Sequence, residues 1–276
     1  MSAISAADVA KLRRVTGAGM MDCKKALEES EGNFDKAIEI IRKKGQAIAN
    51  KRADRDASEG VVLSKAGAGG KIGIMIALNC ETDFVAKNEN FIAFAWSILD
   101  KALTTGAKTL EEVLGLNLDG KTVSDRIIDQ IGVIGEKIEL SFFSRIDAAW
   151  VQPYIHPGNK LATMAGFNKA EIDIQVYKDI AMQIAAMSPV SLDRNDVPEK
   201  VLATEMEIAR ELARREGKPE AMLEKIAEGK LNKFFKESTL LNQEFIKDNK
   251  MNIKQYLQSI DKGLTVTAFT RYTLNL

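Results

Sequence analysis

An internal repeat constrains the fold of this chain more than any other feature of its sequence. Residues 70–79 (GKIGIMIALN) and 159–168 (NKLATMAGFN) share a lysine, a methionine and an asparagine at matching places, and apolar residues face apolar residues at most of the others. Short apolar runs bounded by glycine and polar residues are typical of strands. A repeated strand of this kind predicts two related subdomains, each built around one copy.

The segments around the two copies also correspond. Each predicted strand is followed by a loop and an apolar helix, at about residues 91–103 in the first copy and 175–187 in the second. Each copy also has one strand before it and one at its end. These four flanking strands are expected at residues 60–65, 137–146, 149–155 and 265–274. We therefore predict an α+β core of two subdomains, residues 59–146 and 147–276, each a small antiparallel sheet covered by helices.

The first 45 residues predict a separate module. Apolar residues recur there at helical spacing in three short stripes, separated by glycine-bearing turns at residues 16–19 and 31–33. This pattern favours a three-helix bundle of the ubiquitin-associated (UBA-like) type, either purely structural or used for docking, since Met20 and Met21 follow directly on the first turn. Residues 46–58 are polar and charged and predict a linker or a solvated helix.

An insertion separates the helix of the second subdomain from its last strand. Residues 197–234 contain two amphipathic runs with Gly217 and Pro219 between them. Glycine suits the position after a helix end, and proline suits the first position of the next helix, so we expect an antiparallel helical hairpin. At ~1.5 Å per residue, the helix over residues 198–216 would be about 28 Å long. Such a narrow hairpin is expected to serve as a lever or docking arm, unless it lies flat on its own domain.

Composition argues against several classes of function. Basic and acidic side chains number 39 each and aromatic residues make up 6% of the chain, whereas nucleic-acid-binding proteins usually show a basic excess or a stacking platform. The two cysteines, Cys23 and Cys80, and the one histidine, His156, lack metal-ligand spacing. We therefore expect no direct nucleic-acid partner, no metal site and no cofactor.

The residues that could support catalysis are also poorly placed for it. Cys80 ends an apolar strand, where a cysteine is usually a small buried hydrophobic residue. The glycines at 67–70 lack the Gly-Lys-Ser/Thr ending of a phosphate-binding loop and precede a strand. Residues 1–10 contain no apolar leader, and no run approaches the ~18 apolar residues of a membrane span. We expect a cytoplasmic protein without a membrane partner, a nucleotide site or a chemical active site.

The loop after the first repeat strand is the strongest candidate for a functional site. Residues 79–88 (NCETDFVAKN) place Phe84 between Asp83 and Val85, whereas the matching loop of the second copy, residues 168–173, has no aromatic residue. A phenylalanine in such a loop either folds back as a plug of the core or stands out as an anchor for a pocket on a partner.

Two segments resemble signatures of the elongation factor Ts family. Residues 82–86 (TDFVA) resemble its signature loop, and residues 12–27 (LRRVTGAGMMDCKKAL) are similar to its N-terminal signature. Residues 134–137, 154–156 and 179–186 resemble further family segments in the same order. The resemblance covers the whole chain and implies the same three-part fold that the patterns above predict.

The resemblance also implies an activity, which is guanine-nucleotide exchange on elongation factor Tu in its GDP-bound and nucleotide-free forms. Asp83 and Phe84, flanked by Thr82 and Val85, would intrude between helices of the partner's GTPase domain and disturb its Mg²⁺ site and phosphate-binding loop. Further contacts with the partner are implied for Ile134, Gly135, His156, Met20 and Met21. The hairpin would be a secondary contact. Long bacterial members continue into a C-terminal helical module that also contacts the partner, whereas this chain stops at Leu276, so we expect binding to rest more on the core and the N-terminal module.

Two other functions stay open at this point. A ubiquitin-like or peptide-binding adaptor would rest on residues 4–44 alone and would leave the loop at Phe84 unexplained. An RNA-associated factor is supported only by short basic runs such as Arg42-Lys43-Lys44.

Overall fold

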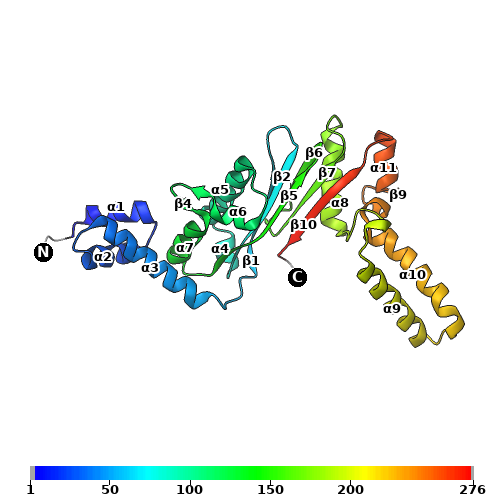
Figure 1. The fold of residues 1–276 in the computed structure, drawn as a ribbon, viewed down its shortest axis with the longest axis horizontal. Helices are drawn as coiled ribbons and strands as arrows, with labels where there is room; N and C mark the ends of the chain where they lie inside the picture. Colours follow the sequence, from blue (N-terminus) through cyan, green and yellow to red (C-terminus); the bar gives the residue numbers. More distant parts are fainter. Residues whose placement is uncertain (1–3, 275–276) are drawn as a thin grey trace.

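The molecule is elongated, with the N-terminal helices at one end, two sheets in the middle and a projecting pair of helices at the other end (Figure 1). The computed structural model describes residues 4–274. Residues 1–3, where the predicted 1–45 module and the segment inspected for a leader begin, lie outside the described residues. Residues 275–276, which end the predicted 147–276 subdomain, also lie outside them.

The N-terminal helices are α1 (Ala6–Thr16), α2 (Met20–Glu29) and α3 (Phe34–Arg52). The side chain of Asn33 caps the first turn of α3, and Gly17, at φ 70°, ends α1 in the left-handed conformation. Helix α3 continues through residues 46–52, so the predicted linker over 46–58 is largely helical, as the solvated-helix alternative required. Only residues 53–58 connect it to the first strand.

Helix α3 packs along α7 (Val123–Ile134) of the adjoining subdomain, because two glycines let the backbones meet. A Cβ atom built at Gly45 would lie 3.1 Å from the carbonyl oxygen of Ile128 and 3.6 Å from the Cα atom of Gly132. Arg42 also forms an ion pair with Asp125 in the first turn of α7. The N-terminal helices are therefore attached to the first subdomain through the middle of α3, and a larger side chain at Gly45 would push the two helices apart.

Within residues 4–274, two three-stranded antiparallel sheets form the centre of the molecule. The first has the order β1-β2-β5, and its strands are Glu59–Ala66, Ile72–Cys80 and Ile138–Asp147. The second has the order β10-β7-β6, and its strands are Val266–Thr273, Leu161–Phe167 and Trp150–Ile155. These strands lie where the repeat predicts them, with ends that differ by one or two residues. Mixed helices and antiparallel sheets confirm the α+β class.

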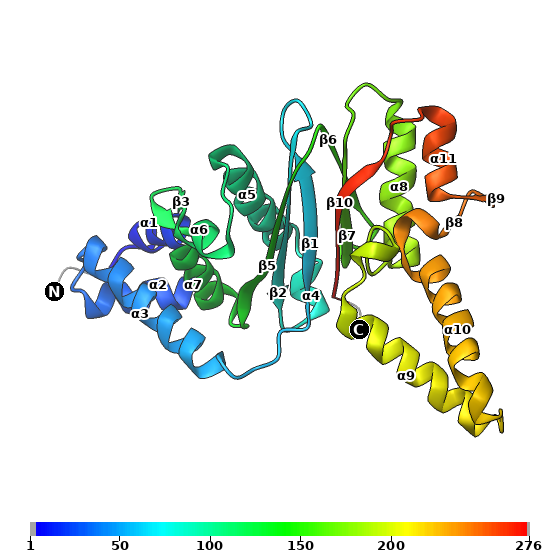
Figure 2. The same ribbon diagram turned by 45° about the vertical axis from the view of Figure 1, so that its right-hand side comes forward.

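The two sheets pack face to face, and helices cover their outer faces (Figure 2). Along β2, Ile74 and Ile76 face the outer helices, whereas Met75 and Ala77 face the second sheet. Both faces of β2 are therefore buried, which explains why its sequence is almost continuously apolar.

The helices on the outer faces are only partly those that the sequence predicts. The predicted ones are α5 (Glu89–Thr105) over the first sheet and α8 (Ile174–Met187) over the second. The sequence analysis missed α6, α7 and α11 and two small hairpins. These elements are α6 (Leu110–Gly115), α7, α11 (Ile253–Ile260), β3 (Asn117–Leu118), β4 (Lys121–Thr122), β8 (Glu244–Phe245) and β9 (Asp248–Asn252).

Helices α9 (Glu199–Arg215) and α10 (Leu223–Ser238) pack against each other and point away from the sheets (Figure 1). Gly217 follows α9 with φ 72°, as expected for a residue after a helix end. Pro219, however, precedes a 3-10 turn (Glu220–Met222) and is not the first residue of the second helix. Helix α10 also runs four residues beyond the predicted limit at 234.

Candidate functional site

The predicted loop forms a one-turn helix, α4 (Asp83–Ala86), directly after β2. Thr82 caps it, because its hydroxyl oxygen accepts a hydrogen bond from the backbone N–H of Val85. Successive residues of a helix point about 100° apart, so Ala86 is buried and Val85 packs against the core while Phe84 is 83% exposed. The alternative in which Phe84 plugs the core is therefore wrong, and Val85 and Ala86 occupy the inward positions.

Asp83 forms an ion pair with Lys87, the residue that follows α4. Its carboxylate lies 2.6 Å from the Nζ atom of Lys87, one helical turn further on. This hydrogen bond holds the pKa of Asp83 below its usual value and raises the pKa of Lys87. Both side chains are accessible to water, where such a pair contributes little to stability. The Asp83 carboxylate is thus charged and reachable by a partner.

The Glu136 side chain anchors the two residues that precede α4. Its carboxylate accepts hydrogen bonds from the backbone N–H groups of Glu81 (3.1 Å) and Thr82 (3.0 Å) and from the Thr82 hydroxyl (2.7 Å). Gly135, at φ 79°, ends α7 in the left-handed conformation, so the chain turns there and brings Glu136 to the loop. The predicted residues Ile134 and Gly135 therefore lie beside the predicted segment Thr82–Val85.

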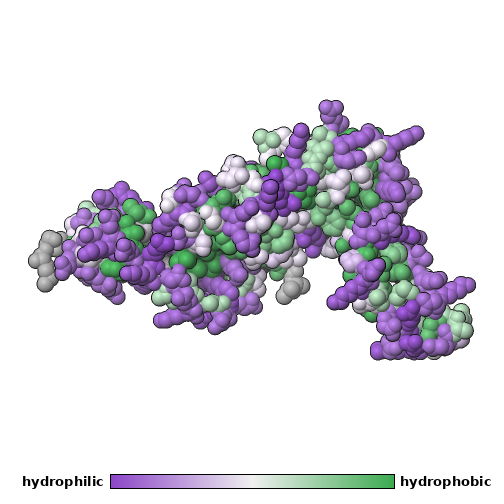
Figure 3. All heavy atoms as spheres, viewed as in Figure 1, coloured by the Kyte–Doolittle hydropathy of each residue, from purple (hydrophilic) through white to green (hydrophobic). Residues whose placement is uncertain are grey.

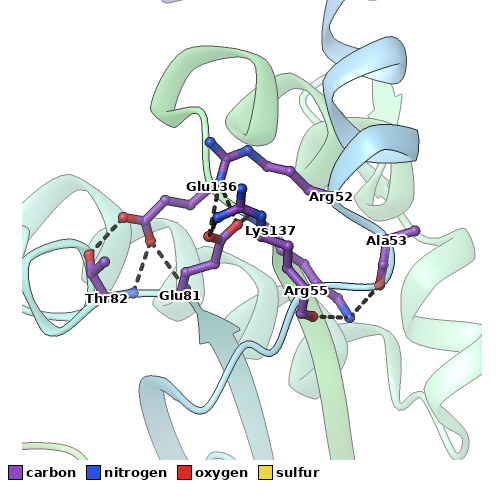
Figure 4. A network of polar contacts seen from close by, with 7 residues as sticks. All are labelled: Arg52, Ala53, Arg55, Glu81, Thr82, Glu136 and Lys137. Atoms are coloured by element: carbon purple, nitrogen blue, oxygen red, sulfur yellow. Dashed lines mark hydrogen bonds and ion pairs between the residues drawn. The ribbon is translucent and has the colours of Figure 1, made fainter.

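Glu81 ties the same loop to the end of α3. Its side chain is 12% exposed and accepts hydrogen bonds from Arg52 (2.7 and 2.9 Å) and from the backbone N–H of Lys137 (2.6 Å). Burial alone would raise the pKa of Glu81, but the Lys137 amide and the Arg52 guanidinium lower it below its usual value. Figure 4 shows the complete set, which we call the loop network and which consists of Arg52, Ala53, Arg55, Glu81, Thr82, Glu136 and Lys137.

Sequence reasoning missed the role of the loop network. Charged residues occur in the loop, as Glu81, and in segment 134–137, as Glu136 and Lys137, which is a usable signal. Which charges meet, however, depends on the antiparallel register that sets Cys80 opposite Ile138, and a single sequence does not reveal that register.

Cys80 is buried at the end of β2, and its Sγ atom donates a hydrogen bond to the Thr82 carbonyl oxygen at 3.2 Å. Burial, assisted by the charge of Glu136, raises the pKa of its thiol to about 12. The thiol is therefore protonated at neutral pH, as expected for a small buried hydrophobic residue. A buried thiol with a raised pKa is a poor nucleophile.

His156 lies exposed in the turn between β6 and β7, where the hydroxyl oxygen of Tyr154 is 2.9 Å from its Nδ1 atom. Lys160, in the same turn, forms a 2.8 Å ion pair with Glu59. Glu59 is in turn the strand partner of Cys80. The turn of His156 and the loop of Phe84 thus lie at the same end of the first sheet.

Met20 and Met21 occupy a separate place on the N-terminal helices. They begin α2 and are 57% and 62% exposed. The preceding turn lies against the end of α7, since a Cβ atom built at Gly17 would be 3.5 Å from Val133, itself 40% exposed. The turn before Met20 and Met21 is therefore close to the end of α7, which is followed by Gly135.

Within residues 4–274, no three His, Cys, Asp or Glu side chains are grouped as a metal site requires. Over the same range, no helix combines the length and apolar character that a membrane crossing needs.

The family model of elongation factor Ts matches residues 81–275. Elongation factor Ts of Porphyromonas gingivalis is 54% identical over 274 residues, which cover 99% of this chain and 99% of that protein. Those of Flavobacterium psychrophilum (50% identical, 99% of this chain, 100% of that protein) and Chlorobium phaeobacteroides (44% identical, 99% of each) match over similar lengths. The fold and the loop define an α+β protein that exposes an apolar side chain on a capped helical turn. The chain belongs to the elongation factor Ts family, as its resemblance indicated.

Proposed function

We propose that this chain is a guanine-nucleotide exchange factor for elongation factor Tu. The observation that carries the proposal is the 83% exposure of Phe84 on a loop that resembles the family's signature. The factor binds the GDP-bound and nucleotide-free forms of its partner in the cytoplasm. It needs no cofactor, no chemical active site and no direct contact with nucleic acid.

In the proposed mechanism, Phe84 enters between helices of the partner's GTPase domain, with Asp83 beside it. This movement disturbs the Mg²⁺ site and the phosphate-binding loop. Burying one phenylalanine is worth ~1.5–3 kcal/mol and each tenfold change in affinity ~1.4 kcal/mol, so the ring accounts for about one to two decades of weakened nucleotide binding. Loss of the partner's Mg²⁺ from the nucleotide phosphates supplies much of the remaining decrease in nucleotide affinity.

The geometry of the loop supports this mechanism. The bonds from Glu81 and Thr82 to Glu136 order the loop before any partner arrives. A preorganised anchor loses less conformational entropy on binding, which leaves more of its binding free energy for weakening the nucleotide.

The remaining contacts follow from the family resemblance and from exposure. We propose that Ile134, Gly135 and His156 extend the contact on the core. Residues 1–45 form a UBA-like docking module that uses Met20 and Met21. Residues 59–146 and 147–276 are the two core subdomains, and the hairpin formed by α9 and α10 is a secondary contact arm.

Release of labelled GDP from elongation factor Tu tests the proposal. Stopped-flow traces should show faster release as this protein is added, and added GDP should weaken the complex of the two proteins by the same factor, because the coupling is reciprocal. A release rate that does not change at any concentration of this protein would rule the proposal out.

A further inference from the structure

The loop network joins the N-terminal helices to the loop of Phe84 by contacts that the fold itself does not require. Arg52 and Arg55 come from the end of α3 and the connection after it, whereas Glu81 directly precedes the capping residue of α4. Arg52 reaches both carboxylate oxygens of Glu81, at 2.7 and 2.9 Å, and Arg55 lies 3.5 Å from the second. Charge-assisted bonds to a carboxylate that is only 12% exposed are strong and weakly screened by salt.

Lys137 closes this connection from the other side. Its backbone N–H donates to Glu81, while its Nζ atom donates to the carbonyl oxygens of Ala53 (2.9 Å) and Arg55 (3.1 Å). The chain leaving α3 is therefore bonded both to the loop and to Lys137, the residue just before β5. A shift of α3 would therefore move Glu81, through the Arg52 side chain and through Lys137.

Glu136 links Glu81 to the helix that carries Phe84, because it bonds both Glu81 and Thr82. The Thr82 hydroxyl donates to Glu136 at 2.7 Å, and its oxygen accepts from the N–H of Val85. A hydroxyl has one proton and two lone pairs, so the bond to Glu136 orients it as the cap of α4. The loop network thus runs without a break from α3 to the turn that presents Phe84 (Figure 4).

The matching loop of the second subdomain provides an internal comparison. It is held within its own subdomain, by an ion pair of Lys169 with Asp261 at 2.7 Å and by bonds of Asn168 to Gly263 and Thr265. The loop of Phe84 is also held within its own subdomain, by Glu136 and Lys137, but it has additional bonds from Arg52 of the N-terminal helices. The repeat fold can therefore secure this loop locally, and the long connection to α3 calls for a reason outside the fold.

We propose that Arg52, Glu81 and Glu136 are positioning residues for nucleotide exchange, through which the N-terminal helices set the pose of Phe84. This inference rests on the proposed exchange function. The N-terminal helices then act twice, once by contacting the partner and once by holding the loop. Loss of the connection lowers the rate at which bound GDP is expelled, while the partner still docks.

Arg52→Ala tests the inference, with Arg42→Ala as its matched control. Arg42 also joins α3 to the first subdomain, but its ion pair ends on Asp125 in the first turn of α7, at the opposite end of that helix from Gly135. With Arg52→Ala, the maximal rate of GDP release should fall about ten-fold, and the half-saturating concentration of factor should change less than about two-fold. Arg42→Ala should keep the wild-type maximal rate. An unchanged rate in Arg52→Ala, or an equal loss in both variants, overturns the inference.

Two further variants separate positioning from folding. Arg52→Lys keeps the charge and should recover part of the lost rate. Glu136→Gln keeps the shape but loses one acceptor oxygen, so it should lower the maximal rate like Arg52→Ala while melting near wild type. A Glu136→Gln protein that exchanges at the wild-type rate contradicts the inference.

Hydrogen–deuterium exchange of the free protein gives a readout that is independent of the partner. The amides of Glu81 and Thr82 should exchange faster in Arg52→Ala than in wild type or Arg42→Ala, whereas the amide of buried Met75 should not change. Equal protection of Glu81 and Thr82 in all three proteins refutes the connection. If the wild type fails to release GDP while these amides still respond, the exchange function is wrong and the connection between α3 and the loop stands.

Discussion

The exposure of Phe84 separates its possible roles at the level of a single residue. Because its ring is 83% exposed, Phe84→Ala should leave the melting temperature of the free protein close to wild type. The same change should lower the maximal rate of GDP release from elongation factor Tu by about one to two decades, since the ring's contacts with the partner are lost. Stopped-flow release and thermal melting of the free variant are the two measurements.

Phe91 is the matched control for that variant. It is the third residue of the next helix, α5, and is 1% exposed. Phe91→Ala should cost ~3–5 kcal/mol of folding stability, with exchange by the remaining folded protein near normal. A Phe84→Ala protein that melts far below wild type and yet exchanges normally would contradict the proposed role of Phe84.

Cys80 should make stability depend on alkaline pH. Burial raises its pKa from 9.0 to about 12, so the folded state disfavours the thiolate that the unfolded state forms. The stabilisation is therefore complete below pH 9 and is lost as the pH rises toward 12. At about pH 10.5 the wild type should have lost ~2 kcal/mol more of its unfolding free energy than Cys80→Ala. Urea denaturation of both proteins from pH 8 upward checks this. If the unfolding free energies of the two proteins change with pH in parallel, burial does not raise the pKa of the Cys80 thiol.

Individual site residues were predictable where type and place along the chain suffice. Phe84 stood out because its repeat counterpart is not aromatic, and Cys80 because it ends an apolar strand. The partners of Glu81 and Glu136 were not predictable. Their bonds depend on how α3 ends and on the register of β2 and β5, and both are consequences of packing between distant segments.

Among the elements, the pair α9 and α10 should be removable. The two helices pack against each other, and Arg210 of α9 pairs with Glu224 of α10 at 3.0 Å. The residues buried in the pair are Ala209, Ala213, Leu223 and Ala227. Replacing residues 200–233 with a short flexible linker should leave a folded core that melts near wild type and retains part of the exchange activity.

The base of this pair must be spared in that experiment. The N–H of Val190 donates to the Ser238 carbonyl (2.8 Å) and that of Leu240 to the Ser191 carbonyl (2.9 Å). The segments that lead into α9 and out of α10 are therefore part of the second subdomain. Circular dichroism during heating and GDP release measure the outcome. A shortened protein that unfolds at a much lower temperature would assign α9 and α10 to the core.

The elements that sequence analysis missed did carry local signals. Val123, Ile127 and Ile131 of α7 recur every four residues, and Asp119-Gly120 is a favoured two-residue hairpin turn between β3 and β4. Helix α3 carries a residue that usually weakens a helix, since Gly45 lies in its interior. The lack of a side chain at Gly45 is what lets α3 approach α7.

Across the whole molecule, the contact between the two sheets joins the subdomains. The repeat indicated two similar units but did not reveal that they pack face to face. A Cβ atom built at Gly73 would lie 2.5 Å from Val151 of the other sheet, and one at Gly166 would lie 2.8 Å from Ile146. Small residues on β2 and β7 thus allow the close approach of the sheets, and the unbroken apolar run of β2 was the one sequence signal for a second covered face.

This contact should make the two subdomains unfold as one unit. Of the chain's two tryptophans, Trp96 lies in α5 on the first sheet and Trp150 in β6 of the second. Variants that retain one tryptophan each, Trp150→Phe and Trp96→Phe, report on the two halves separately. Because the intersheet cluster must open for either half to unfold, Met164→Ala should act on both halves alike. Met164 is fully buried in that cluster, so its truncation should cost ~2–5 kcal/mol.

The prediction is that in each tryptophan background, Met164→Ala lowers the urea midpoint by the same amount, with each denaturation curve a single transition. Met222→Ala is the control, since Met222 is 49% exposed near the tip of the projecting helices and its loss should shift neither midpoint. If Met164→Ala lowers the urea midpoint only in the protein that retains Trp150, the second subdomain unfolds independently of the first. The contact between the sheets would then not couple the two halves. A common shift would instead mean that α3, the loop of Phe84 and the second subdomain are positioned by one cooperative core, so that the stability of either sheet bears on the site.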